Sequence, residues 1–153
     1  MLAGFVFNPI IAKMSLHWHE NDIKSFNKII KKELLIILLL ILVCEIGGYI
    51  LGIPVLSLLY HTDLTNYKTE LLILLLGGGL FAISWFFVTV LTIMRKQNYT
   101  ACGYIIVAIL AFILSPAFVK KYEIIGASLL YLVLMFLLCA IFSLPIIIKR
   151  KTK

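Results

Sequence analysis

The chain has 153 residues, of which 63% are hydrophobic and 14% are charged, and its formal net charge is +7. Soluble domains are about one quarter charged, so this composition argues against a water-soluble globular domain and indicates a protein built for lipid. The basic residues stand in short clusters beside apolar runs, a placement that favours topology signals and contact with anionic headgroups over nucleic-acid binding.

Residues 1–12 are apolar but too short to span a bilayer. They lack the charged start and the cleavage site of a signal peptide. Asn8 and Pro9 are expected to interrupt any helix, because proline lacks a backbone donor and restricts the residue before it. We interpret this segment as the end of a membrane helix.

Residues 13–33 mix charged and apolar side chains and are expected to form a cytoplasmic amphipathic connection. Asp22 is a plausible N-cap, and Trp18 is expected to anchor at headgroup level. A short interfacial helix is predicted here, because apolar residues fall near one face and lysines populate the rest: Ile23, Phe26, Ile29 and Ile30 against Lys24, Lys28, Lys31 and Lys32.

Four apolar runs follow, and a run of roughly 18 or more apolar residues is long enough to cross the bilayer as a helix. The sequence therefore predicts an all-α integral membrane protein with four transmembrane helices after the short interfacial helix. The predicted membrane region is 34–148, with spans at 34–60, 71–94, 101–119 and 124–148, and residues 149–153 form a basic cytoplasmic tail.

The distribution of Lys and Arg predicts the orientation. Residues 13–33, the second loop and the C-terminal tail together carry eleven, whereas the other side holds three: Lys68, Lys120 and Lys121. Cytoplasmic loops carry the excess of basic residues, so both termini are expected in the cytoplasm of a multi-pass plasma-membrane protein.

Glu45 is the acid inside a predicted span, and an intramembrane carboxylate is by default a hypothesis for a transport path or a coupling site. The alternative is a structural glutamate paired with a hydroxyl or with Tyr49, one turn further on.

Gly77, Gly78 and Gly79 form either a hinge or a point of close helix packing. Pro54 and Pro116 lie within predicted spans, as does Pro145, and proline allows kinks; at Pro54 a kink is expected because the ring crowds the carbonyl of Ile50. The hydroxyl-bearing side chains either contact a sugar or bridge helices: Ser84, Thr89, Thr92 and Tyr104.

Neither catalysis nor a cofactor is predicted. The sequence shows no Ser/His/Asp arrangement and no glycine-rich loop between strand and helix. His17 and His19 have no third metal ligand nearby and are interpreted as interfacial. Cys44, Cys102 and Cys139 lie in or at the edge of apolar runs and are interpreted as small buried side chains.

An ordered series of motifs resembles the C-terminal half of polysaccharide and oligosaccharide flippases, within the superfamily of multidrug, oligosaccharidyl-lipid and polysaccharide exporters. The series runs through Gly52-Ile53-Pro54-Val55-Leu56-Ser57-Leu58-Leu59-Tyr60, Asp63-Leu64, Tyr67-Lys68, Glu70-Leu71, Gly77-Gly78-Gly79, Leu91-Thr92-Ile93-Met94-Arg95-Lys96-Gln97, Gly103-Tyr104 and Lys120-Lys121-Tyr122. Upstream, Phe7 with Pro9, and Trp18 followed by Asp22-Ile23-Lys24 and Phe26, are similar to that family's cytoplasmic connection.

The resemblance implies translocation of lipid-linked oligosaccharide or polysaccharide repeat units by alternating access. It also implies that this chain corresponds to the last four helices of a transporter with some 12 to 14, as a truncated or split product. The partners implied are the lipid bilayer, the lipid-linked oligosaccharide, and either the absent N-terminal lobe or further copies of the chain. Three residues depart from the family's pattern: His61 and Glu123 stand where glycine is common, and Glu45 replaces an apolar residue.

Two other interpretations remain open. One is a small four-helix proton-coupled exporter, which Glu45 fits loosely. The other is a non-transporting accessory membrane subunit of polysaccharide biosynthesis.

Overall fold

The computed structural model of the chain describes residues 2–151, with the side chains of residues 10–148. The described part is helical, with short connections. In chain order, it comprises α1 (Leu2–His19), α2 (Ile23–Gly47), the π-helical turn η1 (Gly48–Gly52), α3 (Ile53–Tyr60), the 3-10 turn η2 (Thr65–Tyr67), α4 (Lys68–Ile93) and α5 (Gln97–Lys151).

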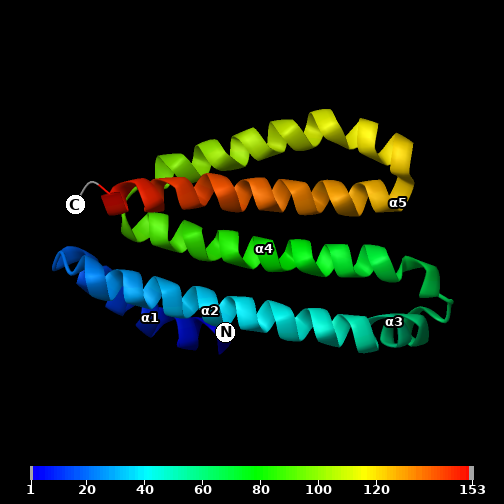
Figure 1. Cartoon of the computed structure of the whole chain (residues 1–153), viewed down its shortest axis with the longest axis horizontal. Coiled ribbons are helices and arrows are strands. Elements are labelled where there is room, and N and C mark those ends of the chain that lie inside the picture. The colour runs from blue at the N-terminus through cyan, green and yellow to red at the C-terminus, as the bar shows by residue number, and fades with distance from the viewer. Residues whose placement is uncertain (1, 152–153) are drawn as a thin grey trace.

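The long helices lie side by side along one direction, and α1 lies against the first part of α2 (Figure 1). Within residues 2–151, three stretches are long and apolar enough to cross a membrane: Ile23–Tyr60, Thr65–Ile93 and Gln97–Ile148. The prediction of a helical, multi-pass membrane protein is therefore confirmed at this level.

α1 corrects one expectation from the sequence. The helix runs unbroken through Asn8 and Pro9, where an interruption was predicted. Proline removes one backbone hydrogen bond, but helices of membrane proteins tolerate this where neighbouring groups compensate. α1 ends at His19, and Asn21, with φ 59°, makes the turn into α2.

Asp22 caps α2 as predicted: its carboxylate accepts a hydrogen bond from the backbone N–H of Ser25 at 3.1 Å. Hydrogen bonding with Ser25 lowers the pKa of Asp22, because it favours the ionised carboxylate. Phe26 and Ile30 are buried on the predicted apolar face. The rings of Phe26 and Trp18 lie 5.1 Å apart between centroids, which fixes α1 against α2.

No separate interfacial helix ends at residue 33. α2 continues from Ile23 to Gly47, and the helical stretch extends to Tyr60. The sequence around 33–34 contains neither glycine nor proline, so the amphipathic turns and the apolar turns form one helix.

A π-helical turn, Gly48–Gly52, precedes Pro54, where a kink was expected. Pro54 lies in the first turn of α3, where the lack of a backbone donor is tolerated. In Figure 1, α2 and α3 follow one another as one long helical rod. A π-turn within a helix often marks a functional position.

α5 folds back on itself at Glu123, and its two limbs lie side by side (Figure 1). Glu123, with φ 50° and ψ −127°, is the one residue with non-helical backbone angles within the described part of α5. Three residues later, a Cβ atom at Gly126 would collide with the backbone carbonyl oxygen of Phe118. Glycine is therefore required at 126, because backbone cannot move aside as a side chain can.

The core lies where α4 packs against both limbs of α5, the most extensive helix contact of the described chain. Val90, Leu91 and Phe142 are fully buried there. Gly103 on the first limb lets the Phe142 ring approach its backbone. By contrast, the most apolar window of Ile23–Tyr60 buries none of its residues, which leaves that face to lipid or to a partner.

We expect Glu123→Gly to stabilise the protein. A non-glycine residue in such a sparsely populated conformation costs about 1–3 kcal/mol, and glycine's larger loss of entropy on folding offsets roughly 0.5–1 kcal/mol of that. The net gain is about 1 kcal/mol, to be measured by reversible unfolding in detergent micelles followed by circular dichroism. Lys120→Gly, in the helical part of the same limb, is the control and should destabilise. A loss of stability in Glu123→Gly would contradict the expectation.

Candidate functional site

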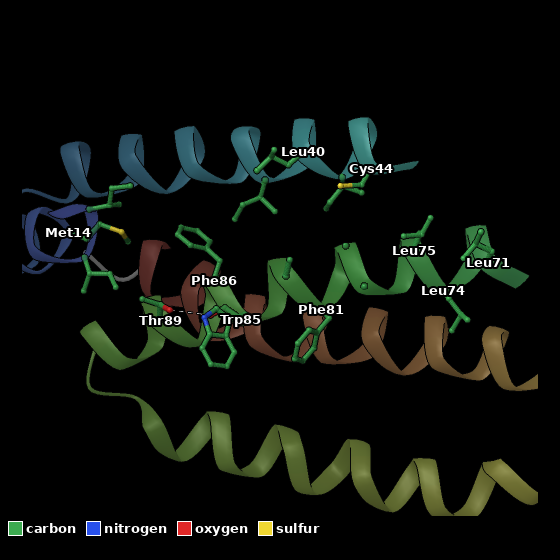
Figure 2. A pocket seen from close by; sticks show the side chains of 17 residues that line it. Met14, Leu40, Cys44, Leu71, Leu74, Leu75, Phe81, Trp85, Phe86 and Thr89 are labelled. Atoms are coloured by element: carbon green, nitrogen blue, oxygen red, sulfur yellow. Dashed lines mark hydrogen bonds between the residues drawn. The ribbon is translucent and has the colours of Figure 1, made fainter. Parts of the chain in front are cut away.

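A groove of about 960 Å³ runs between α1, α2 and α4. Figure 2 shows Leu40 and Cys44 of α2 pointing toward α4, and Leu75 and Phe86 of α4 pointing back toward α2. The lining residues Phe81 and Trp85 project on the other side of α4, and Met14 of α1 lies at one end. Nearly every lining side chain is apolar. Trp85 leaves 64% of its surface exposed, so the groove is open at its side.

Glycine contacts bring α2 and the π-helical turn η1 close to α4 beside this groove. A Cβ atom at Gly79 would lie 2.8 Å from Ile41 of α2, and one at Gly52 would lie 2.6 Å from Leu71 of α4. Gly48 receives the side chain of Leu75 in the same way. Small residues let helix backbones approach closely in lipid, and here they do so along the length of the pair.

The three consecutive glycines of α4 face three different surroundings. A Cβ atom at Gly77 would lie 2.6 Å from the ring of Tyr131 on the second limb of α5, whereas Gly79 meets α2. Gly78 lines the groove, and a Cβ atom there would meet nothing within 4 Å. α4 stays helical through all three residues, and Gly77 and Gly79 are points of close packing.

Glu45 lies on α2 next to the groove residue Cys44. Its Oε1 atom is buried and has no hydrogen-bond partner among the described residues. Tyr49, the partner considered from the sequence, instead places its ring 3.6 Å from the ammonium group of Lys68. Oε1 of Glu45 is therefore left without the hydroxyl or tyrosine partner considered from the sequence.

The other candidate residues lie apart from the groove. Pro54 is the second residue of α3, next to the π-helical turn. Pro116 and Pro145 lie in different limbs of α5, and the backbone at both stays helical. The structure thus brings Gly78 and Gly79 into the groove wall, with Glu45 beside it, and leaves both proline-bearing limbs elsewhere.

Three of the four hydroxyl groups considered for sugar contact, those of Ser84, Thr89 and Thr92, bond to their own helix. Ser84 donates to the carbonyl of Leu80 at 2.9 Å, and Thr92 donates to that of Val88 at 2.9 Å. Thr89, which lines the groove, donates to the carbonyl of Trp85 at 3.2 Å, as the dashed line in Figure 2 marks. Such bonds satisfy hydroxyls in an apolar medium. They leave the groove with little polarity.

Basic side chains gather at one end of the bundle, where α1 turns into α2 and where α4 ends (Figure 1). Among residues 10–148, seven cationic residues lie there against three acids: Lys13, Lys24, Lys28, Lys31, Lys32, Arg95 and Lys96, with Glu20, Asp22 and Glu33. The opposite end has equal numbers of each: Lys68, Lys120 and Lys121 with Asp63, Glu70 and Glu123.

The histidines and cysteines form no metal centre within residues 2–151. His17 places Nδ1 3.8 Å from the Asp22 carboxylate and 3.9 Å from that of Glu20, at the turn between α1 and α2. All three cysteines are free thiols.

The groove itself was missed from the sequence, although a signal is present. Groove residues recur along α4 at helical spacing, through Leu71, Leu74, Gly78, Phe81, Trp85 and Thr89. Because the rest of α4 is also apolar, this stripe does not stand out from its surroundings.

Comparison with known protein families, with curated proteins and with solved structures finds no match to this chain.

We expect Gly77→Ala to destabilise the helix bundle by about 1–3 kcal/mol, because overpacking forces neighbours to move, here the Tyr131 ring. Gly78→Ala is the matched control: its Cβ meets open space, and alanine favours helix by about 1 kcal/mol over glycine. Unfolding in detergent micelles measures both. Tyr131→Ala should reduce the penalty of Gly77→Ala in a double-mutant cycle. Equal effects at 77 and 78 would show that the α4–α5 contact is loose.

Proposed function

We propose that this chain is the C-terminal part of a membrane flippase that translocates lipid-linked oligosaccharide or polysaccharide repeat units across the plasma membrane. In this proposal it crosses the bilayer four times: once with Ile23–Tyr60, once with α4 and once with each limb of α5. Both termini lie in the cytoplasm.

The positions of two unusual residues support the family assignment. In the flippases that this sequence resembles, glycine is common at the positions of His61 and Glu123. Both residues have positive φ, 51° at His61 and 50° at Glu123, a backbone conformation that favours glycine. The turns of this fold therefore fall where the resemblance places glycine, and this agreement is the observation that carries the proposal.

The charge distribution supports the orientation. The end of the bundle that carries seven basic residues against three acids among residues 10–148 is the end that would face the cytoplasm. The charge-balanced end, at His61 and Glu123, would then lie on the outer side.

The open apolar surface supports the proposal that this chain is one part of a larger transporter. Transporters of this kind bind their substrate between two lobes that rock against each other, and the face of Ile23–Tyr60 is unburied over its most apolar window. A second lobe against this face and the groove would complete a cavity that four helices alone leave open.

The test is complementation in cells whose own repeat-unit flippase is truncated to remove its last four helices. We expect this chain to co-purify with the truncated flippase and to restore surface polysaccharide, whereas neither part restores it alone. Co-purification without export would favour the accessory subunit. No co-purification and no export would overturn the proposal.

The buried, unpartnered Oε1 of Glu45 favours a second candidate, a four-helix proton-coupled exporter. This candidate requires proton-dependent drug resistance that Glu45→Gln abolishes and the exposed Glu20→Gln retains. We expect instead that cells expressing the chain alone show no resistance with any of the three forms. Resistance lost only in Glu45→Gln would replace the flippase proposal with the exporter.

A further inference from the structure

We propose that the groove between α1, α2 and α4 binds the hydrocarbon chain of an anionic lipid, with its headgroup at the basic end of the bundle. The inference rests on the membrane placement in the proposed function and identifies the groove as the surface that holds the lipid part of the substrate class.

The length of the groove is close to the thickness of the hydrocarbon core of a bilayer. It is lined along α4 from Leu71 to Thr89, which at 1.5 Å per residue is about 27 Å. The hydrocarbon core of a bilayer is about 30 Å thick. The volume of about 960 Å³ lies at the upper end of the roughly 300–1,000 Å³ typical of small-molecule sites.

A helix fills this space less well than a hydrocarbon chain. α1 already occupies one end: Met14 is 1% exposed, and Ile10 and Ile11 form part of the wall. A flexible chain can follow the space that remains, whereas a rigid helix as long as the groove would collide with α1.

The lining allows a chain to be held without polar partners. The hydroxyl of Thr89 is engaged by the carbonyl of Trp85, and open space lies over Gly78. When lipid surrounds the protein, burying a chain in the groove takes no apolar surface out of water. Retention of the chain therefore depends on van der Waals contact with the groove walls.

The positive charge at one end of the groove indicates which lipid headgroup would bind there. α1 lines the groove at the end of the bundle where α2 carries the exposed side chains of Lys24, Lys28, Lys31 and Lys32. Each Lys or Arg near a membrane surface contributes about 1 kcal/mol of attraction to anionic lipid. A phosphate-bearing headgroup therefore fits this end, and both an acidic phospholipid and a polyprenyl phosphate carry that chemistry.

Fluorescence quenching tests the site directly, because Trp85 lines the groove. The chain has one other tryptophan, Trp18, and replacing it leaves Trp85 as the single tryptophan reporter. In Trp18→Phe protein in detergent micelles, phosphatidylglycerol with brominated chains is titrated, and quenching of Trp85 is recorded. We expect saturable quenching by this lipid, with a half-saturating mole fraction at least about threefold lower than for brominated phosphatidylcholine. Unbrominated phosphatidylglycerol and polyprenyl phosphate, added as competitors, distinguish the two sources of the chain.

Two glycine variants separate the groove from the general lipid surface. Gly78→Leu places a side chain in the groove, whereas Gly47→Leu adds the same side chain to α2 outside the groove lining; a Cβ atom at either position meets nothing within 4 Å. We expect Gly78→Leu to raise the half-saturating mole fraction at least about tenfold and Gly47→Leu to change it less than twofold. Circular dichroism verifies that both variants fold.

Quenching that rises linearly with lipid, or saturable quenching that survives in Gly78→Leu, would overturn the proposal. So would a dimer, measured by light scattering, that Gly78→Leu dissociates, because a second copy would then occupy the groove. The transport proposal is judged separately. Saturable binding without restored export would reject the flippase proposal and retain the lipid site. Restored export without saturable binding would retain the flippase proposal and reject the lipid site.

Discussion

Close approach of helices around α4 determines how this protein is assembled. In lipid there is little hydrophobic drive between helices, so association depends on packing at small residues. α4 contacts α1, α2 and α5, and two glycines only two residues apart serve opposite neighbours: Gly77 admits Tyr131 of α5, and Gly79 admits Ile41 of α2. The groove is the space that remains when α2 and α4 meet at glycines on one side and α1 covers only one end.

The regular elements could be predicted because lipid leaves the backbone few choices. Every backbone group in the hydrocarbon region has to be satisfied internally, which makes long apolar runs helical. The Asp22 cap was confirmed for a local reason, since a side chain and a backbone N–H three residues on suffice to form it. Local rules failed at the prolines. Pro9 lies inside α1, and a π-helical turn precedes Pro54, because the effect of a lost hydrogen bond depends on how the neighbouring turn adjusts.

The candidate site was predictable only as separate residues. The sequence identified Glu45 and the glycine run, but which glycine faces a helix and which faces open space depends on the rotation of α4 within the bundle. That rotation is fixed by contacts far apart in the sequence, such as Gly77 with Tyr131. A helix that is apolar on all sides gives no periodic signal of its orientation. The hydroxyl groups illustrate the same limit, since Ser84 and Thr92 use their own helix carbonyls.

The reversal at Glu123 has a consequence for biogenesis. Because a single residue turns α5 back on itself, the stretch Gln97–Ile148 offers no extended loop to a protease or an inserted epitope, which need several residues of free backbone. If each limb crosses the bilayer, as proposed, the limbs are joined so tightly that they would enter it as one helical hairpin. Lys120, Lys121 and Glu123 would then be carried across at its tip, and the order of membrane insertion would follow from the turn itself.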